Sequence, residues 1–179
     1  MTRKVVFRDM DACINCKACV IACKVKHMSP VYPATPAPPT PGIRSLVNIY
    51  RCGPEMRGDR VYQSFVSIAC MHCEDAACMR VCPVSAIRKD AETGITLVEH
   101  ALCIGCNACL WVCPYGAPSF DEAGKLMLCD LCIDRLKEGK KTACEAACQA
   151  AAIFVGTAEE VSELQARKAV GRIEKGMMV

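Results

Sequence analysis

The stretch Cys-Ile-Gly-Cys-Asn-Ala-Cys-Leu-Trp-Val-Cys-Pro, residues 103–114, decides how this chain folds. Its spacing is C-x2-C-x2-C-x3-C-P, which is typical of iron-sulfur cluster motifs. Three closely spaced thiolates on a tight loop can hold three corners of one iron-sulfur cube. The fourth cysteine follows one helical turn later and is carried towards a different cube. The spacing therefore predicts clusters that come in pairs.

Zinc is the alternative metal for closely spaced cysteines. Zinc sites are typically built from separated C-x2-C pairs, whereas this run places three thiols within seven residues and adds a fourth with a proline behind it. The run at 103–114 therefore favours an iron-sulfur cluster over zinc.

Sixteen of the 17 cysteines fall into four groups of four. The first group repeats the spacing of the run without its proline, and the second widens the middle gap to four residues. The fourth, C-x2-C-x11-C-x3-C, would by itself also suit a zinc ribbon. The predicted ligands are Cys13, Cys16, Cys19 and Cys23; Cys70, Cys73, Cys78 and Cys82; Cys103, Cys106, Cys109 and Cys113; and Cys129, Cys132, Cys144 and Cys148. Cys52 belongs to no group and is interpreted as a buried or inert thiol without a ligand role.

Disulfides are the other use of so many cysteines in a short chain. The first ten residues lack the apolar core and cleavage site of a signal peptide, and the cysteine count is odd. No apolar run approaches the roughly 18 residues that span a bilayer. We therefore expect thiols committed to metal, an apoprotein that is largely unfolded, and no membrane span in this chain.

The charge balance is mildly basic, because lysine and arginine exceed aspartate and glutamate by 22 − 19 = 3. A cube held by four thiolates carries about −2 when oxidised, so four cubes reverse this balance. The basic excess is interpreted as compensation for cluster charge. With one Trp, four Tyr and four Phe, the chain offers no stacking platform for nucleic acid.

Catalytic motifs are missing from the sequence: it has no nucleophile and base pair, no phosphate-binding loop and no dinucleotide fingerprint. His27, His72 and His100 are scattered and have no partner visible in the sequence. His72 lies between two cysteines and is interpreted either as a hydrogen-bond donor to cluster sulfur or as an ordinary imidazole. Trp111 is interpreted as packing that shields a cluster. The chain is thus predicted to conduct electrons rather than to catalyse a reaction.

Short elements separate the cysteine groups. Strands are predicted at 4–7, 46–51, 61–68, 86–89, 95–98, 119–120, 125–128 and 153–155, with a loop at 52–60. Helices are predicted from 18 towards 26, over the charged segment 134–141, and after a capping box at 157–160. Residues 29–42 contain six prolines and are predicted to be extended, either as a connector or as a strap that lies on a partner.

Three motifs accompany the four groups: Cys-Met-His-Cys-Glu-Asp at 70–75, Cys-Pro-Tyr-Gly-Ala-Pro at 113–118 and Cys-Asp-Leu-Cys-Ile-Asp-Arg at 129–135. With the order of the groups, they resemble the four-cluster iron-sulfur subunits of dimethyl sulfoxide reductase and related molybdopterin oxidoreductases. The resemblance covers about residues 5–155. One departure is Gln149 after the last cysteine, where such subunits usually have proline, which puts the local turn in doubt.

The resemblance implies an α+β fold of two interleaved bacterial-ferredoxin-like modules. The outer module would comprise 1–69 and 114–179, including the Pro-rich strap at 29–42, and the inner module 70–113. The implied cubes are held by Cys13, Cys16, Cys19 and Cys148; by Cys129, Cys132, Cys144 and Cys23; by Cys70, Cys73, Cys78 and Cys113; and by Cys103, Cys106, Cys109 and Cys82.

The resemblance also implies a function and partners. The chain would be a non-catalytic electron-transfer subunit with four 4Fe-4S clusters, connecting a large molybdenum- or tungsten-pterin catalytic subunit to a further redox subunit or carrier. The alternatives are a free-standing polyferredoxin, a small subunit of a tungsten aldehyde oxidoreductase or hydrogenase complex, and a structural zinc protein. A cytoplasmic location is expected, with export to the periplasm beside a folded partner as the alternative.

Overall fold

The computed structural model describes residues 3–27, 45–174 and 176 of the chain. Its described part combines helices with four two-stranded antiparallel sheets, which is an α+β fold. The Pro-rich segment 29–42 lies outside the described residues. No helix within the described ranges is long and apolar enough to cross a membrane.

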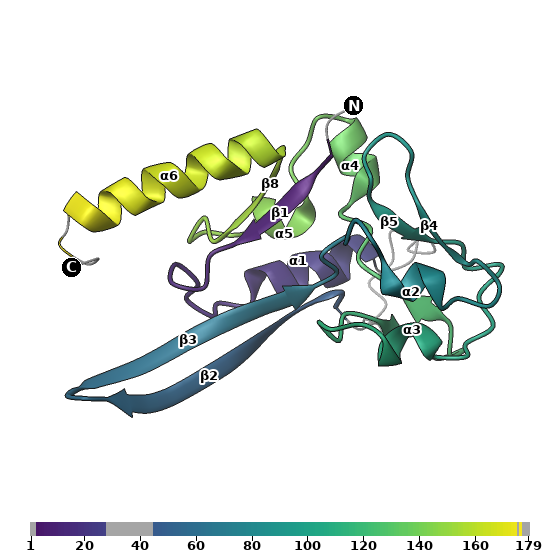
Figure 1. Cartoon of the computed structure of the whole chain (residues 1–179), viewed down its shortest axis with the longest axis horizontal. Helices are drawn as coiled ribbons and strands as arrows, with labels where there is room; N and C mark the ends of the chain where they lie inside the picture. The colour runs from purple at the N-terminus through teal and green to yellow at the C-terminus, as the bar shows by residue number, and fades with distance from the viewer. Residues whose placement is uncertain (1–2, 28–44, 175, 177–179) are drawn as a thin grey trace, which may run out of the picture.

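The two ends of the chain are joined in one sheet. Strand β1 (Val5–Arg8) runs antiparallel to β8 (Ile153–Gly156), with Val5 opposite Gly156 and Arg8 opposite Ile153. Helix α1 (Ala18–His27) packs against the short helix α5 (Ala143–Ala146), and α6 (Ala158–Glu174) packs along β1 and β8 (Figure 1). The first and fourth cysteine groups are thereby brought into one body.

Helix α6 begins with the predicted capping box. The Thr157 backbone N–H donates to Glu160 Oε2 at 2.7 Å, and the Glu160 N–H donates to Thr157 Oγ1 at 3.2 Å. One face of the helix buries Val161 and directs Lys168 to Asp9 at 2.8 Å. The predicted final helix is thus confirmed, and it rests on the start of the chain.

Strands β2 (Val47–Arg57) and β3 (Arg60–Ala69) form a long hairpin that projects from the body (Figure 1). The predicted loop at 52–60 was wrong, because a register shift between Cys52 and Glu55 absorbs Gly53 and Pro54 and pairing then resumes. A side chain at Gly53 would place its Cβ 2.6 Å from the Tyr62 carbonyl oxygen, so only glycine fits this bulge. Cys52 is exposed on β2 rather than buried.

The middle of the chain repeats a short helix followed by a small hairpin. The first repeat is α2 (Ala77–Arg80), β4 (Ile87–Lys89) and β5 (Thr96–Val98); the second is α3 (Ala108–Trp111), β6 (Ser119–Phe120) and β7 (Leu126–Met127). The four strands lie within the strands predicted at 86–89, 95–98, 119–120 and 125–128.

Helix α4 (Ile133–Lys137) ends earlier than the predicted insert at 134–141. Gly139 adopts a positive φ of 71° and the Lys140 N–H bonds back to the Arg135 carbonyl at 2.9 Å, which closes the helix C-terminus.

Among the described residues, apolar packing is divided among three small clusters rather than one core. One contains Leu46, Val47 and Ile153, a second Ile87, Leu126 and Leu128, and a third Val6, Ile95 and Leu131. Cysteines contribute to the first two clusters, so predicted metal ligands and core residues share the same small interior.

Candidate metal centres

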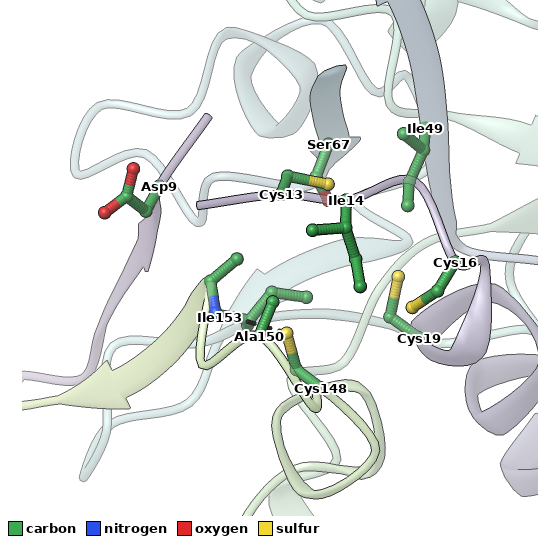
Figure 2. A pocket seen from close by; sticks show the side chains of 11 residues that line it. Asp9, Cys13, Ile14, Cys16, Cys19, Ile49, Ser67, Cys148, Ala150 and Ile153 are labelled. Carbon is green, nitrogen blue, oxygen red and sulfur yellow. Dashed lines mark hydrogen bonds between the residues drawn. The ribbon is translucent and has the colours of Figure 1, made fainter. Parts of the chain in front are cut away.

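The first centre lies where α1 meets the turn after α5. One cavity is lined by Cys13, Cys16, Cys19 and Cys148, with Ile14 and Ile153 supplying apolar walls. Figure 2 shows Cys16 and Cys19 entering from the loop and first turn of α1, and Cys148 from the opposite side. Three thiols of group one therefore meet one thiol of group four.

The inner groups exchange a cysteine in the same way. One cavity brings together Cys82, Cys103, Cys106 and Cys109, and another Cys70, Cys73, Cys78 and Cys113. In each cavity three thiols come from one group and the last from the other group. Phe120 and Leu126 of the β6–β7 hairpin also line the first of these cavities.

The remaining four predicted ligands are gathered around the contact of α1 with α5. Cys23 and Cys144 are buried in one apolar cluster, and Cys129 packs against it. Cys132 is buried too and lies within the electrostatic influence of Cys144 and Cys23. Three cavities thus gather twelve of the predicted ligands, the other four lie around an apolar cluster that also contains Cys19 and Cys148, and Cys52 lines none of these cavities.

The four ligand loops share one backbone feature. The second residue after the first cysteine of each group has a positive φ: Asn15 at 56°, His72 at 48°, Gly105 at 71° and Leu131 at 53°. Backbone turns of this kind collect N–H groups in a concavity that favours negative charge. A Cβ on Gly105 would lie 2.6 Å from the Gly124 carbonyl oxygen, so its loop packs too closely for any side chain.

The last cysteine of three groups is followed by the same turn. The third residue after it is left-handed, namely Ser85, Gly116 and Ala151. The fourth then donates its N–H to the cysteine sulfur: Ala86 to Cys82 at 3.2 Å, Ala117 to Cys113 at 3.4 Å and Ala152 to Cys148 at 3.2 Å. The turn after Cys148 therefore survives without the proline.

His27 has partners that the sequence did not reveal. Its Nδ1 lies 2.8 Å from the Cys23 carbonyl oxygen and 3.6 Å from Cys23 Sγ, and its Nε2 lies 3.0 Å from Asp130 Oδ1. His27 stands four residues after Cys23 on a predicted helix, which is a signal for that contact. Asp130 is far away in sequence and had no such signal.

Burial changes the acidity of the thiols. It raises the pKa of Cys19, Cys70, Cys109 and Cys132 to about 11, and it raises the pKa of Cys78 and Cys129 as well. Cys23 differs: burial acts to raise its pKa, but the hydrogen bond and charge of His27 lower it below the usual value. Buried thiols of this kind ionise when a metal cation compensates the charge.

His72 is a buried neutral ring beside the Cys70 loop. Its Nδ1 accepts the Thr96 N–H at 3.1 Å, and burial, with the charge of Lys89, lowers its pKa to about 4. The donor to Cys70 Sγ is the His72 backbone N–H, at 3.4 Å. The imidazole of His72 is therefore an ordinary packed ring, and the main chain rather than the ring makes the sulfur contact.

Trp111 does not shield a cluster, because 85% of its surface is exposed. The shielding interpretation was wrong: α3 buries Cys109 and directs the indole outward.

The chemistry of the sites fits iron-sulfur cubes. Each of the three cavities supplies four sulfur donors, and backbone N–H groups point at several of the sulfurs. Thr96 Oγ1 is buried without a hydrogen-bond partner, and Thr96 lines the cavity of Cys70, Cys73, Cys78 and Cys113. A sulfide acceptor in that cavity would satisfy this hydroxyl.

Comparison with known proteins adds an independent line. Residues 61–158 match the family described as "4Fe-4S dicluster domain", and residues 10–26 match a "4Fe-4S binding domain". A chain of the anaerobic dimethyl sulfoxide reductase of Escherichia coli K12 is 37% identical over 164 residues, which cover 87% of this chain and 74% of the relative. A subunit of the sulfite dehydrogenase of Allochromatium vinosum is 35% identical over 87% of this chain and 69% of the relative. The hydrogenase-2 operon protein HybA of Escherichia coli O157:H7 is 32% identical, covering 86% and 51%.

Proposed function

This chain belongs to the iron-sulfur electron-transfer subunits of the dimethyl sulfoxide reductase family of molybdopterin oxidoreductases, and on that premise we propose how its cysteines hold clusters and what the clusters connect. It carries 4Fe-4S clusters and transfers electrons in an oxidoreductase complex as a non-catalytic subunit. When bound, such a cluster takes up and releases one electron at a time.

Four centres with exchanged ligands are proposed. The observation that carries this is that three cavities each combine three thiols of one group with one thiol of another. The centres are held by Cys13, Cys16, Cys19 and Cys148; Cys129, Cys132, Cys144 and Cys23; Cys70, Cys73, Cys78 and Cys113; and Cys103, Cys106, Cys109 and Cys82. The backbone N–H groups after Cys82, Cys113 and Cys148 stabilise thiolate charge, and the apolar walls exclude water.

Two interleaved modules follow from this ligation. Pairing of β1 with β8 and contact of α1 with α5 support an outer module built from both ends of the chain. The inner module reaches about residue 128 in our proposal, beyond the predicted boundary at 113. The reason is that Phe120 and Leu126 line an inner cavity, and the Leu126 N–H donates to Cys103 Sγ at 3.4 Å.

Electrons enter and leave at two surface centres in this proposal. Cys16 and Cys106 are the exposed thiols of their sets, and Ile14 and Ile104 beside them are 63% and 64% exposed. We assign the Cys16 end to a large molybdenum- or tungsten-pterin catalytic subunit and the Cys106 end to a further redox subunit or carrier. The location remains a prediction: cytoplasmic, or periplasmic through export beside the partner.

A pair of assays on one purified complex tests this assignment. Cys106→Ser should abolish electron exchange with the natural carrier while sparing turnover driven by small dyes that reach the catalytic subunit directly. The complex should still elute as one large species, because the outer module that docks is untouched. Equal loss in both assays with assembly intact would contradict the orientation, and elution of this chain alone would favour a free-standing polyferredoxin.

A further inference from the structure

The chain after Cys23 follows a different path from the chain after Cys82, Cys113 and Cys148. Cys82, Cys113 and Cys148 are each followed by a left-handed turn whose N–H returns to the sulfur. After Cys23 the chain continues as α1 to His27, so its backbone follows the helical path instead of folding back. Lys24 permits the helix at the position where proline stands after Cys82 and Cys113, although the lack of proline is not sufficient, since the turn after Cys148 forms with Gln149 there.

The side chain of His27 stands where the other groups place a backbone donor, and the Leu46 backbone N–H and the Ser45 side chain also hydrogen-bond to the Cys23 sulfur. His27 is the fourth residue after the cysteine, as Ala86, Ala117 and Ala152 are in the other groups. Its Nδ1 faces the Cys23 sulfur at 3.6 Å and the Cys23 carbonyl oxygen at 2.8 Å. A carbonyl oxygen only accepts, so Nδ1 must donate here.

Asp130 completes the arrangement. Its Oδ1 lies 3.0 Å from His27 Nε2 and accepts the Cys132 backbone N–H at 2.8 Å. A carboxylate is also an acceptor, so both ring nitrogens carry protons and the ring is positively charged. The ligand atoms of His27, Asp130 and Cys132 all lie within 4.8 Å of one another. One ring therefore links the α1 ligand to the loop that carries Cys129 and Cys132.

We propose that His27 is a positioning and tuning residue for the centre of Cys129, Cys132, Cys144 and Cys23, in which its ring N–H adds a cationic donor to the Cys23 sulfur. This rests on the ligand set assigned under the proposed function. One-electron reduction adds negative charge to a centre, and a cationic donor beside its sulfur favours that charge. His27 therefore raises the reduction potential of this centre.

The ordinary alternative is that His27 only packs α1 against the Asp130 loop. A packing role would lower stability when the ring is removed but would leave the potential of an intact centre where it was.

The test is a potentiometric titration followed by electron paramagnetic resonance on the complex. A Cys23→Ser variant assigns the signal of the centre. In His27→Leu the reduced-to-oxidised ratio of that signal at fixed potential should fall at least tenfold, which is about 59 mV for a one-electron couple. His27→Gln, which keeps a neutral donor, should give a smaller shift, and His100→Leu, at an exposed histidine, should give none.

Histidine labelled with ¹⁵N in the ring gives a second readout. Pulsed resonance should show a weak ring-nitrogen coupling to the reduced centre that disappears in His27→Leu. Four unchanged potentials with iron content intact would overturn the inference, as would loss of a non-iron metal, since the ring would then be a ligand. Failure of the proposed function looks different: Cys23→Ser and Cys132→Ser would alter different signals.

Discussion

The two halves that we propose for this molecule are held together by different means. In the outer half, segments far apart in sequence pair directly, as β1 does with β8 and Asp9 with Lys168. In the inner half, residues 70–128, the sheets are local hairpins whose strands have three residues in β4 and two in β6. The inner half therefore lacks the long-range pairing of the outer one, and we expect its fold to depend more strongly on bound clusters.

The largest effect is expected from a ligand change in the inner half. Cys82→Ser should damage the centre of Cys103, Cys106 and Cys109, because Cys82 lines their cavity and not that of its own group. Iron should fall by about four atoms per chain. Limited proteolysis should then cut within 70–128 while the outer half stays resistant.

Spectroscopy decides between ligation schemes in this variant. If Cys82→Ser alters the same signal as Cys70→Ser, the proposed exchange of ligands is wrong. Cys52→Ser is the matched control: its thiol is exposed on β2, so all four signals should remain.

A smaller effect is expected in the outer half, at Asp9. Its Oδ1 accepts the N–H groups of Asp11 and Ala12, and Oδ2 accepts from Lys168. Burial acts to raise the pKa of Asp9, but the Lys168 hydrogen bond and the backbone donors lower it overall. A lowered pKa means that the stabilisation is present above the unfolded pKa near 3.8 and is lost as pH falls through the folded value.

Asp9→Asn should therefore lower the unfolding free energy of the loaded protein by about 1 to 2 kcal/mol at pH 7. The difference from the parent protein should shrink as pH falls below 3.8, measured by anaerobic thermal unfolding. Arg167→Met is the control, because its partner Glu163 is exposed and the pair is expected to contribute less than about 1 kcal/mol. A difference that grows on acidification would contradict the assigned charge state.

The cysteine spacing predicted most of the ligand loops because each loop is a local structure. Every group places a left-handed residue two positions after its first cysteine, so the turn is encoded within a few residues. The capping box of α6 was predictable for the same reason.

Features that depend on distant partners or on small irregularities escaped prediction. Gly53 and Pro54 indicate a loop locally, but a bulge absorbs them because β3 supplies the pairing on both sides. The contact of His27 with Asp130 joins residues 103 positions apart, and no local pattern announces it. Trp111 looked like packing by residue type alone, whereas the direction of α3 exposes it.

The number of clusters is the central claim, and metal analysis of anaerobically purified protein tests it most directly. We expect about sixteen iron and sixteen acid-labile sulfide per chain, with no stoichiometric zinc. A value near eight iron would mean that one of the two proposed modules holds no clusters. Zinc without sulfide would contradict the iron-sulfur assignment.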